Sequence, residues 1–364
     1  MTPSDRLLDF RSDTVTRPTS GMRAAMAEAV VGDDVFSEDP TVIRLQERLA
    51  NLLGKEAALF VPSGTMSNQI AVRVHCGPGD EMLCETTCHI YRYEQGGFAQ
   101  LSGVVARTVQ GQYGVLSASQ LDGLIQPDNE HLVRTRLVCL ENTHNRGGGR
   151  VLPYDGLVEI CDWAHHNGLV THLDGARLFN AVVATRIDAR RWAQHFDTVS
   201  VCFSKGLGAP VGSALSGPSS LIARARRHRK LFGGGMRQAG IIAAGALYAL
   251  ENHIERLAED HANARLLTDG IRQLEGLTLQ PEVVDTNIVI FRVDPQLGTA
   301  ADFSLRLREL GVLMYAIGPT QIRAVTHLDV TRADVQRAVS AIAEVVKTAA
   351  APASTASHGQ GAYH

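Results

Sequence analysis

Hydrophobic and polar positions follow one another in a regular order along most of the chain. From about residue 56, short apolar runs are followed by stretches whose apolar residues recur every three or four positions. The first pattern predicts strands and the second predicts helices. The predicted strands are 57–61, 136–140, 169–173 and 198–203, and the predicted helices include 66–74 and 157–166. Strands separated by such helices form βαβ units, so we predict an α/β domain with a mostly parallel sheet covered on both faces.

The pattern changes beyond Arg237. Residues 239–269 form one long helical pattern without proline, which predicts a connector into a smaller C-terminal α+β domain. Strands of that domain are expected near 287–293 and 322–326. The tail is rich in Ala, Ser and Gly, and we expect it to be disordered. The chain is therefore divided into four parts: an N-terminal arm at 1–17, a large domain at 18–250, a small domain at 251–347 and the tail at 348–364.

Composition narrows the classes of function. The 364 residues are 45% hydrophobic, enough for a large core and for two domains. A net charge of −3 gives no reason to expect binding to nucleic acid or to an anionic membrane. The basic run RARRHRK (224–230) has no interleaved aromatic residues, so we interpret it as a helix face or a subunit contact. Without a secretory signal or a membrane-spanning stretch, and with six cysteines of which several lie in apolar runs, we expect a cytoplasmic protein.

Two polar residues at strand ends are the strongest candidates for chemistry. Ligands of open parallel sheets bind at the carboxyl ends of the strands. One strand ends in Asp174, and the next, one βαβ crossover later, runs into Ser204–Lys205 and a glycine-rich turn. Pyridoxal 5'-phosphate (PLP) needs such a pair, because a lysine forms its Schiff base and a carboxylate keeps its ring nitrogen protonated. The alternative from these two residues alone is an ordinary ion pair at the sheet edge.

The segment PSGT, residues 62–65, joins a strand directly to a helix. Gly64 and Thr65 would present free backbone N–H groups and the positive end of the helix dipole to a phosphate. Plain helix capping is the alternative, and the segment is neither a P-loop nor a GxGxxG fingerprint. Together with Asp174 and Lys205, the segment favours a phosphate site.

Histidine and arginine supply the remaining candidates. His89 could stack on a cofactor ring, act as a base or be structural, and no second ligand pair with zinc spacing supports a metal site. His144 directly follows another predicted strand. Arg323 is a candidate clamp for a substrate carboxylate, because arginine pairs with carboxylates in a bidentate way. The segment 11–18 (RSDTVTRP) is either a solvated arm or a cover over the site.

Segments throughout the chain resemble the L-threonine aldolases of low or L-allo specificity. They are, in order, DFRSDTVTRPT, VGDDVFSEDPTV, GKEAALFVPSGTMSN, CLENTHN, HLDGARLFNAVVA, SVCFSKGLGAPVGS, GGGMRQAGI and VTHLD. The resemblance extends over residues 9–331. It implies the aspartate-aminotransferase-like fold (fold type I) of PLP enzymes, with a large domain and a smaller C-terminal domain.

The resemblance also implies a role for individual residues. Lys205 is similar to the Schiff-base lysine and Asp174 to the partner of the ring nitrogen. Gly64 and Thr65 are implied to cradle the phosphate, with Ser204 beside the cofactor, and His89 is implied to stack on the cofactor ring. Ser12, Arg177 and Arg323 are implied to clamp the substrate carboxylate, and His144 to lie near the substrate hydroxyl. Arg237 is implied to make a phosphate or interface contact from a neighbouring subunit. That last contact implies a homo-oligomer, expected to be a tetramer built of dimers.

The implied reaction is retro-aldol cleavage of the Cα–Cβ bond of L-threonine, L-allo-threonine or a related β-hydroxy-α-amino acid, giving glycine and an aldehyde. Two features depart from the family pattern: Phe36 stands where many relatives have tyrosine, and the segment 145–150 (NRGGGR) is longer than in the shortest members. The alternatives are a β-eliminating amino-acid lyase, an aldolase that prefers phenylserine, and a PLP-binding protein without catalytic activity.

Overall fold

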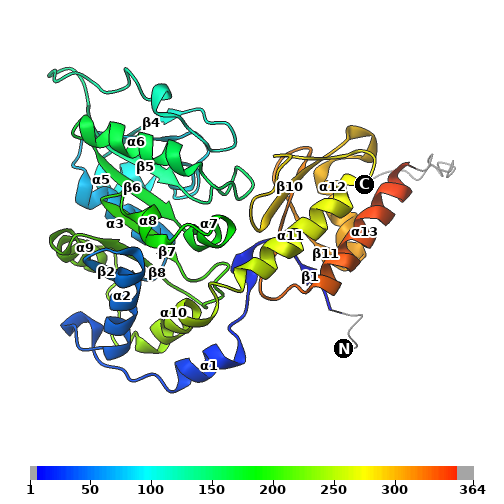
Figure 1. Cartoon of the computed structure of the whole chain (residues 1–364), viewed down its shortest axis with the longest axis horizontal. Coiled ribbons are helices and arrows are strands. Elements are labelled where there is room, and N and C mark those ends of the chain that lie inside the picture. The colour runs from blue at the N-terminus through cyan, green and yellow to red at the C-terminus, as the bar shows by residue number, and fades with distance from the viewer. Residues whose placement is uncertain (1–5, 351–364) are drawn as a thin grey trace, which may run out of the picture.

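The computed structural model describes residues 6–350, and they form a large and a small domain (Figure 1). The large domain contains a seven-stranded sheet in the order β2-β8-β7-β6-β5-β3-β4. Only β8 runs antiparallel to its neighbours β2 and β7, so the prediction of a mostly parallel sheet is confirmed. The strands are β2 (Ala57–Val61), β8 (Ser213–Gly217), β7 (Thr198–Cys202), β6 (Val170–Gly175), β5 (Arg134–Glu141), β3 (Asp80–Glu85) and β4 (Val105–Val109).

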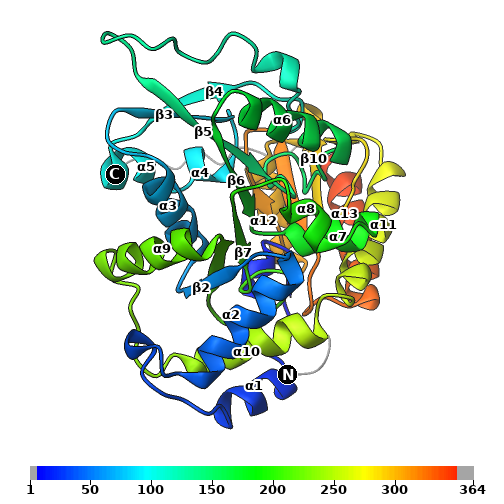
Figure 2. The ribbon, with the colours of Figure 1, turned by 60° about the vertical axis from the view of Figure 1, so that its left-hand side comes forward.

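Helices cover both faces of this sheet (Figure 2). Both faces of the sheet are apolar, because successive side chains of a strand point to opposite faces. In β2, Leu59 packs with the helices on one face and Phe60 with the helices on the other. The first face is covered by α3 (Gly64–His75), α5 (Gly97–Ser102) and α9 (Ser219–Leu231), and the second by α2 (Pro40–Leu53), α6 (Tyr154–His166) and α8 (Ala189–Ala193). The βαβ pattern in the sequence is therefore confirmed.

The small domain has a four-stranded antiparallel sheet in the order β12-β13-β10-β9. Its strands are β12 (Tyr315–Ala316), β13 (Gln321–Val325), β10 (Ile288–Val293) and β9 (Leu277–Leu279), and its helices are α11 (Leu257–Arg272), α12 (Ala300–Glu309) and α13 (Arg332–Ala350). The first described residues of the segment predicted as an N-terminal arm lie in this domain. Its strand β1 (Leu8–Asp9) pairs with β11 (Val312–Leu313), and Leu8 and Phe10 are buried in the small-domain core.

Two boundaries predicted from the sequence are wrong. Residues 239–269 are not one helix but two, α10 (Gly240–Asn252) and α11, with a turn at 253–256. The turn is held by His253, whose Nδ1 donates to the carbonyl of Leu207 at 2.7 Å. The predicted tail also starts too early, because α13 continues to Ala350 and includes Thr348. The rest of the predicted tail lies outside the described residues.

Among residues 6–350, no helix combines the length and the apolar character needed to cross a membrane.

Candidate active site

Asp174 and Lys205 lie at the carboxyl ends of two neighbouring strands. Strand β6 contains Asp174 and pairs with β7, and Lys205 follows in the loop after β7. Asp174 is buried and Lys205 is half-buried. Burial by itself raises the pKa of Asp174, but the charges of His89 and Lys205 and a hydrogen bond from Asn68 outweigh it and hold this pKa below its ordinary value. The arrangement keeps a carboxylate ionised beside an accessible amine.

The predicted phosphate segment forms the first turn of α3. Ser63 is the N-cap residue and accepts a hydrogen bond from the N–H of Met66. The first amides of a helix, here those of Gly64 and Thr65, have no acceptor within the helix and remain available to an anion. A Cβ atom on Gly64 would lie 2.7 Å from Sγ of Cys202, the last residue of β7. Glycine therefore lets the start of α3 approach the strand that leads to Lys205.

His89 is oriented by a buried carboxylate. Its Nδ1 lies 3.0 Å from Oε1 of Glu94, and its backbone N–H donates to Glu141 at 2.7 Å. Burial lowers the pKa of His89, but the hydrogen bond to Glu94 and the charge of Asp174 outweigh burial and raise the pKa above its ordinary value. The side chain of His89 is 28% exposed, so its ring can be reached from the site.

Glu94 was not among the sequence candidates. It is fully buried, and besides His89 it accepts hydrogen bonds from the amides of Asn68 at 2.9 Å and Gln69 at 2.5 Å. His89, Glu94 and Asp174 hold their ligand-type atoms within 4.8 Å of one another, a set that could bind a metal ion. Their facing atoms are already engaged with each other and with Asn68, which favours an organised hydrogen-bond network.

Arg323 is a half-buried cation with an unused donor. Its Nη1 donates to Oδ1 of Asn145 and its Nη2 to the carbonyl of Arg11, both at 3.1 Å. Its Nε is buried without a hydrogen-bond partner. Burial and the nearby charge of Arg177 lower the pKa of Arg323, although Asp13 acts in the opposite direction. A bound carboxylate would supply the missing hydrogen-bond acceptor and compensate the positive charges of Arg323 and Arg177.

The other two residues of the predicted clamp lie beside Asp13. Arg177 donates from Nε and Nη2 to the two oxygens of Asp13 at 2.7 and 2.6 Å, which leaves Nη1 for another acceptor. Ser12 caps the short helix Asp13–Val15, and its Oγ accepts from the N–H and the hydroxyl of Thr14. The proton of the Ser12 hydroxyl is consequently available for donation. Within the segment 11–18, Arg11 thus contacts Arg323 and Asp13 contacts Arg177, so its first residues are packed against the site.

His144 is more enclosed than the sequence indicated. Its side chain is 1% exposed, and Nδ1 accepts a hydrogen bond of 3.0 Å from the N–H of Gly147. The proton of the neutral ring therefore resides on Nε2, which lies 3.2 Å from Oε2 of Glu85 and 3.9 Å from Oε2 of Glu141. Burial disfavours the charged ring, while these two carboxylates raise the pKa of His144. The role of His144 as a base stays a prediction.

The sequence is similar to a known protein family and to named relatives over most of its length. The beta-eliminating lyase family matches residues 9–294. The low-specificity L-threonine aldolase 1 of Arabidopsis thaliana is 42% identical over 355 residues, which cover 96% of this chain and 99% of the relative. The chain belongs to the beta-eliminating lyase family, and to its threonine aldolases.

Solved structures agree on the fold of this family. The threonine aldolase of Leishmania major superposes with a TM-score of 0.81 at 21% identity and covers 93% of this chain and 99% of that one. A structure of SPT with PLP superposes with a TM-score of 0.75 at 17% identity, covering 94% of this chain and 88% of that one. The fold is that of the fold type I PLP enzymes, as predicted.

Arg237 contacts the segment that contains Phe36, the position that departs from the family pattern. Arg237 donates from Nη1 to Asp33 at 2.9 Å, and its backbone carbonyl accepts from the N–H of Asp34. Phe36, the departure from tyrosine, is 69% exposed in the same segment. Arg229 in the basic run is buried and pairs with Asp34 at 2.7 Å, so part of that run has an intramolecular role.

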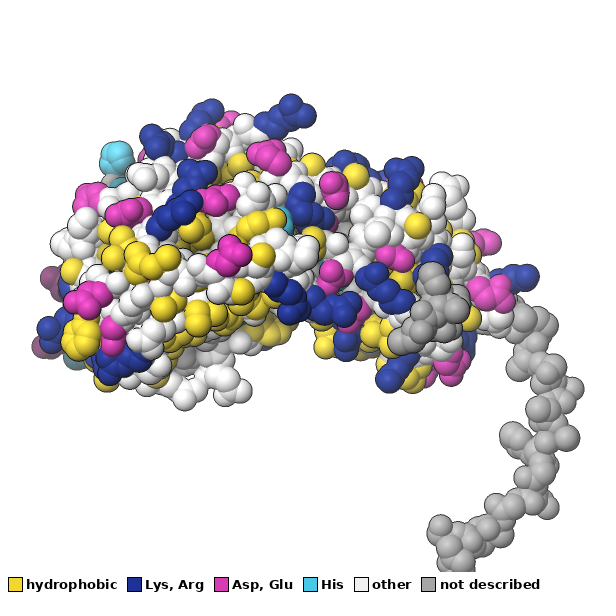
Figure 3. Space-filling model, turned by 90° about the horizontal axis from the view of Figure 1, so that it is seen from below, with side chains coloured by type: hydrophobic (Ala, Val, Ile, Leu, Met, Phe, Trp, Pro, Cys, Tyr) yellow, Lys and Arg dark blue, Asp and Glu magenta, His cyan; other side chains and the backbone are white. Residues whose placement is uncertain are grey.

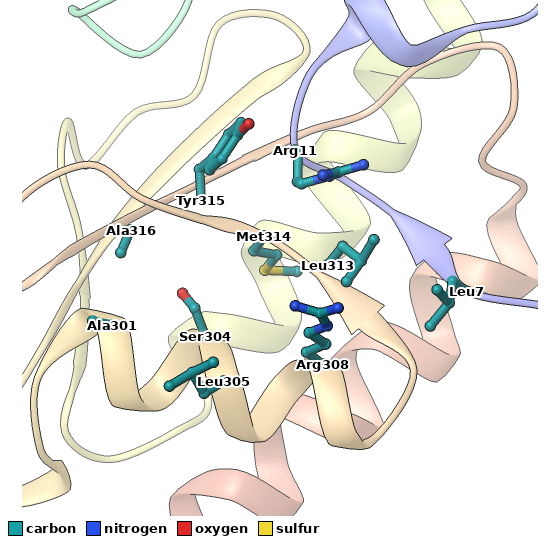
Figure 4. A pocket seen from close by; sticks show the side chains of 10 residues that line it. All are labelled: Leu7, Arg11, Ala301, Ser304, Leu305, Arg308, Leu313, Met314, Tyr315 and Ala316. Carbon is teal, nitrogen blue, oxygen red and sulfur yellow. The ribbon is translucent and has the colours of Figure 1, made fainter.

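A separate pocket of about 630 Å³ lies in the small domain, between α12 and the segment β11–β12 (Figure 4). Arg11 and Tyr315 line one side, and Ser304, Leu305 and Arg308 line another. Neither Lys205 nor Asp174 lines this pocket, so the pocket is distinct from the candidate active site around these two residues.

Proposed function

We propose that this protein is a PLP-dependent aldolase that cleaves L-threonine, L-allo-threonine and related β-hydroxy-α-amino acids to glycine and an aldehyde. The observation that carries the proposal is the position of Lys205 and Asp174 at the ends of adjacent strands, which matches the needs of a carbonyl cofactor. The names of the relatives support the choice of substrate. Such an enzyme is a carbon–carbon lyase.

The residues around Lys205 fit PLP by the chemistry of their donors. Lys205 would hold the cofactor covalently, with Ser204 beside it. Gly64 and Thr65 would bind the phosphate through the free amides at the start of α3. Asp174 would accept a hydrogen bond from the ring nitrogen, and His89 would stack on the ring. When bound, PLP accepts the electron pair that the broken Cα–Cβ bond leaves behind.

The substrate carboxylate would bind to Arg323 through its unpartnered Nε, with Ser12 and Nη1 of Arg177 as further donors. This clamp fixes the rotation of the substrate about its N–Cα bond. The clamp would therefore decide which bond of the substrate is positioned for cleavage. Because these three residues bind the carboxylate, the site favours an α-amino acid over an amine, which has no carboxylate.

A base must take the proton of the β-hydroxyl group. His89 and His144 are the candidates, directly or through a water molecule. In this state His144 has Nδ1 engaged with Gly147 and Nε2 facing Glu85, whereas His89 uses Nδ1 for Glu94 and keeps Nε2 for a ligand. His89 can therefore act without a change of conformation, while His144 would have to leave Glu85.

We further propose a cytoplasmic homo-oligomer, a tetramer built as a dimer of dimers, in which Arg237 reaches a neighbouring active site. Hydrophobic side chains gather on the underside of the large domain (Figure 3). Exposed apolar residues on the elements around Arg237 include Val30, Phe36, Leu231 and Ile241, each at least 49% exposed. Apolar surface of this kind supports a contact with a second copy of the chain.

The experiment supplies PLP and, separately, L-threonine, L-allo-threonine and their D-enantiomers, and measures glycine and acetaldehyde. Equimolar products from an L-isomer, lost in Lys205→Ala, are expected. Membership of the beta-eliminating lyase family supports one alternative reaction, β-elimination, which would release ammonia and a keto acid instead. Phenylserine tests the other rival, a preference for an aromatic aldehyde product. A protein that binds PLP and releases no aldehyde from any substrate would contradict the proposal.

A further inference from the structure

A line of buried polar side chains leads from Asp174 into the interior of the large domain. Nδ2 of Asn68 lies 2.9 Å from Oδ2 of Asp174 and 2.9 Å from Oε1 of Glu94. On its other side, Oδ1 of Asn68 lies 3.1 Å from Nε2 of His172. Asn68, Glu94, Asp174 and His172 are all at most 3% exposed. These side chains come from α3, the segment after α4, and β6, so the line connects separate elements of the domain.

The line continues through a threonine to a second histidine. Oγ1 of Thr198, at the start of β7, lies 2.9 Å from Nδ1 of His172 and 2.8 Å from Nε2 of His75. Thr198 is fully buried, and His75 is partly buried in the last turn of α3. Burial lowers the pKa of His172 to about 3 and that of His75 to about 4, so both rings are neutral near pH 7.

The direction of each hydrogen bond follows from the carboxylates at one end. Ionised carboxylates only accept, so both amide protons of Asn68 point to Asp174 and Glu94, and Oδ1 is left facing His172. Nε2 of His172 must then carry the ring proton, and Nδ1 must accept from the hydroxyl of Thr198. The oxygen of Thr198 accepts in turn from Nε2 of His75. Reversing one member would place two acceptors or two donors face to face in a buried site.

We propose that Asn68, His172 and Thr198 are positioning residues that fix the orientation and the ionised state of Asp174. Oδ1 of Asp174 accepts from the N–H of Ala176 at 3.1 Å and Oδ2 from Asn68, so the carboxylate is held from both sides. Without the proton on Nε2 of His172, the Asn68 amide could flip and turn its oxygen toward two carboxylates. The inference rests on the cofactor part of the proposed function, because it assigns Asp174 to the ring nitrogen of PLP.

Thr198→Val tests this inference, because valine keeps the shape of the side chain and removes its hydroxyl. His172 then loses the donor to Nδ1 and can adopt its other tautomer. We expect the apoprotein of this variant to bind PLP about tenfold more weakly or worse, the effect of losing one charge-assisted hydrogen bond at Asp174. Thr198→Ser retains the hydroxyl and should restore the affinity to within about twofold of the wild type.

Ser200→Ala is the matched control. Ser200 lies two residues further along β7, is buried, and pairs through its hydroxyl with Ser67 of α3 at 2.7 Å. The variant therefore removes a buried hydroxyl between the same two elements and leaves the line from Asp174 intact. PLP titration should show nearly wild-type affinity. Equal weakening by Ser200→Ala and Thr198→Val, or unchanged affinity in Thr198→Val, would overturn the proposal.

Neutron diffraction of the wild-type holoprotein gives an answer even if a variant does not fold. Deuterium on Nε2 of His172 and none on Nδ1 is the expected result, and the reverse would refute the inference. Neither measurement uses the aldolase reaction. If PLP affinity and the His172 proton follow the expectation while no substrate is cleaved, the proposed activity fails and the positioning role of these residues stands.

Discussion

The ion pair between Asp13 and Arg177 allows a quantitative test of how the N-terminal segment is held. The side chains are 0% and 6% exposed, and two hydrogen bonds of 2.6 and 2.7 Å join them. Asn287 of the small domain also approaches Asp13, at 3.4 Å. Asp13→Asn leaves the buried guanidinium of Arg177 without its counter-charge. Breaking a buried pair in this way costs about 3–5 kcal/mol, so we expect the free energy of unfolding to fall by about that amount.

The assay is urea unfolding of the apoprotein at a fixed protein concentration, which avoids the contribution of bound cofactor. Asp9→Asn is the control, because the Asp9–Arg11 pair has a similar length of 2.6 Å but side chains that are 25% and 40% exposed. It should cost about 1 kcal/mol or less.

A double variant, Asp13→Asn with Arg177→Met, separates the pair from its surroundings. If the cost of Asp13→Asn is the unpaired charge of Arg177, the double variant should lose no more stability than the single one. A loss equal to the sum of the two single variants would refute the reasoning. So would a loss below about 1 kcal/mol in Asp13→Asn, because it would mean that water or another acceptor replaces the carboxylate.

Three further predictions concern the site and its surroundings. Gly114→Ala would place a Cβ atom 2.1 Å from Cγ of His144 and should lower both Tm and the aldolase rate. Gly79 has nearly the same positive φ but faces open space, so Gly79→Ala should cost only the backbone strain of about 1 kcal/mol and leave the rate unchanged. Arg323→Lys loses the planar fork and should raise KM about tenfold or more with a smaller effect on kcat, and an unchanged KM would exclude the proposed clamp. Burial lowers the pKa of His261 to about 4, so this residue takes up a proton in the unfolded chain at a higher pH, about 6.5, than in the folded protein. The free energy of unfolding should therefore decline as the pH falls from about 6.5 to 4, by up to about 1.4 kcal/mol per pH unit for this group. His261→Gln should flatten this decline in urea titrations.

The strands and helices around the site could be predicted from the sequence with good boundaries. The apolar run ending at Asp174 is β6 in the structure, and the run before Lys205 is β7. Such runs are informative because buried parallel strands are rich in apolar residues, and polar side chains at their carboxyl ends lie where a ligand or solvent is reached. The long helix at 239–269 was predicted wrongly, because the contact of His253 with Leu207 that holds its turn joins residues 46 positions apart.

The candidate residues differ in how much of their setting the sequence revealed. Glu94 follows His89 by five positions, and a buried acid near a candidate histidine could have been found by asking which group orients the ring. His172 lies inside a predicted strand with no sequence signal for its link to Asn68, 104 positions away. That contact depends on how α3 is rotated against the sheet, and a hydrophobic pattern does not determine the rotation to the accuracy of a hydrogen bond.

The sequence by itself determined the α/β class and the positions of Asp174 and Lys205 at the ends of neighbouring strands, because periodicity and strand ends are local properties. The tertiary structure decided which charges meet. Only the folded chain brings Asp13 to Arg177 across 164 positions and Arg323 to Asn145 across 178. These contacts join the N-terminal segment, the large domain and the small domain, and their partners are selected by the packing of the domains rather than by any spacing along the chain.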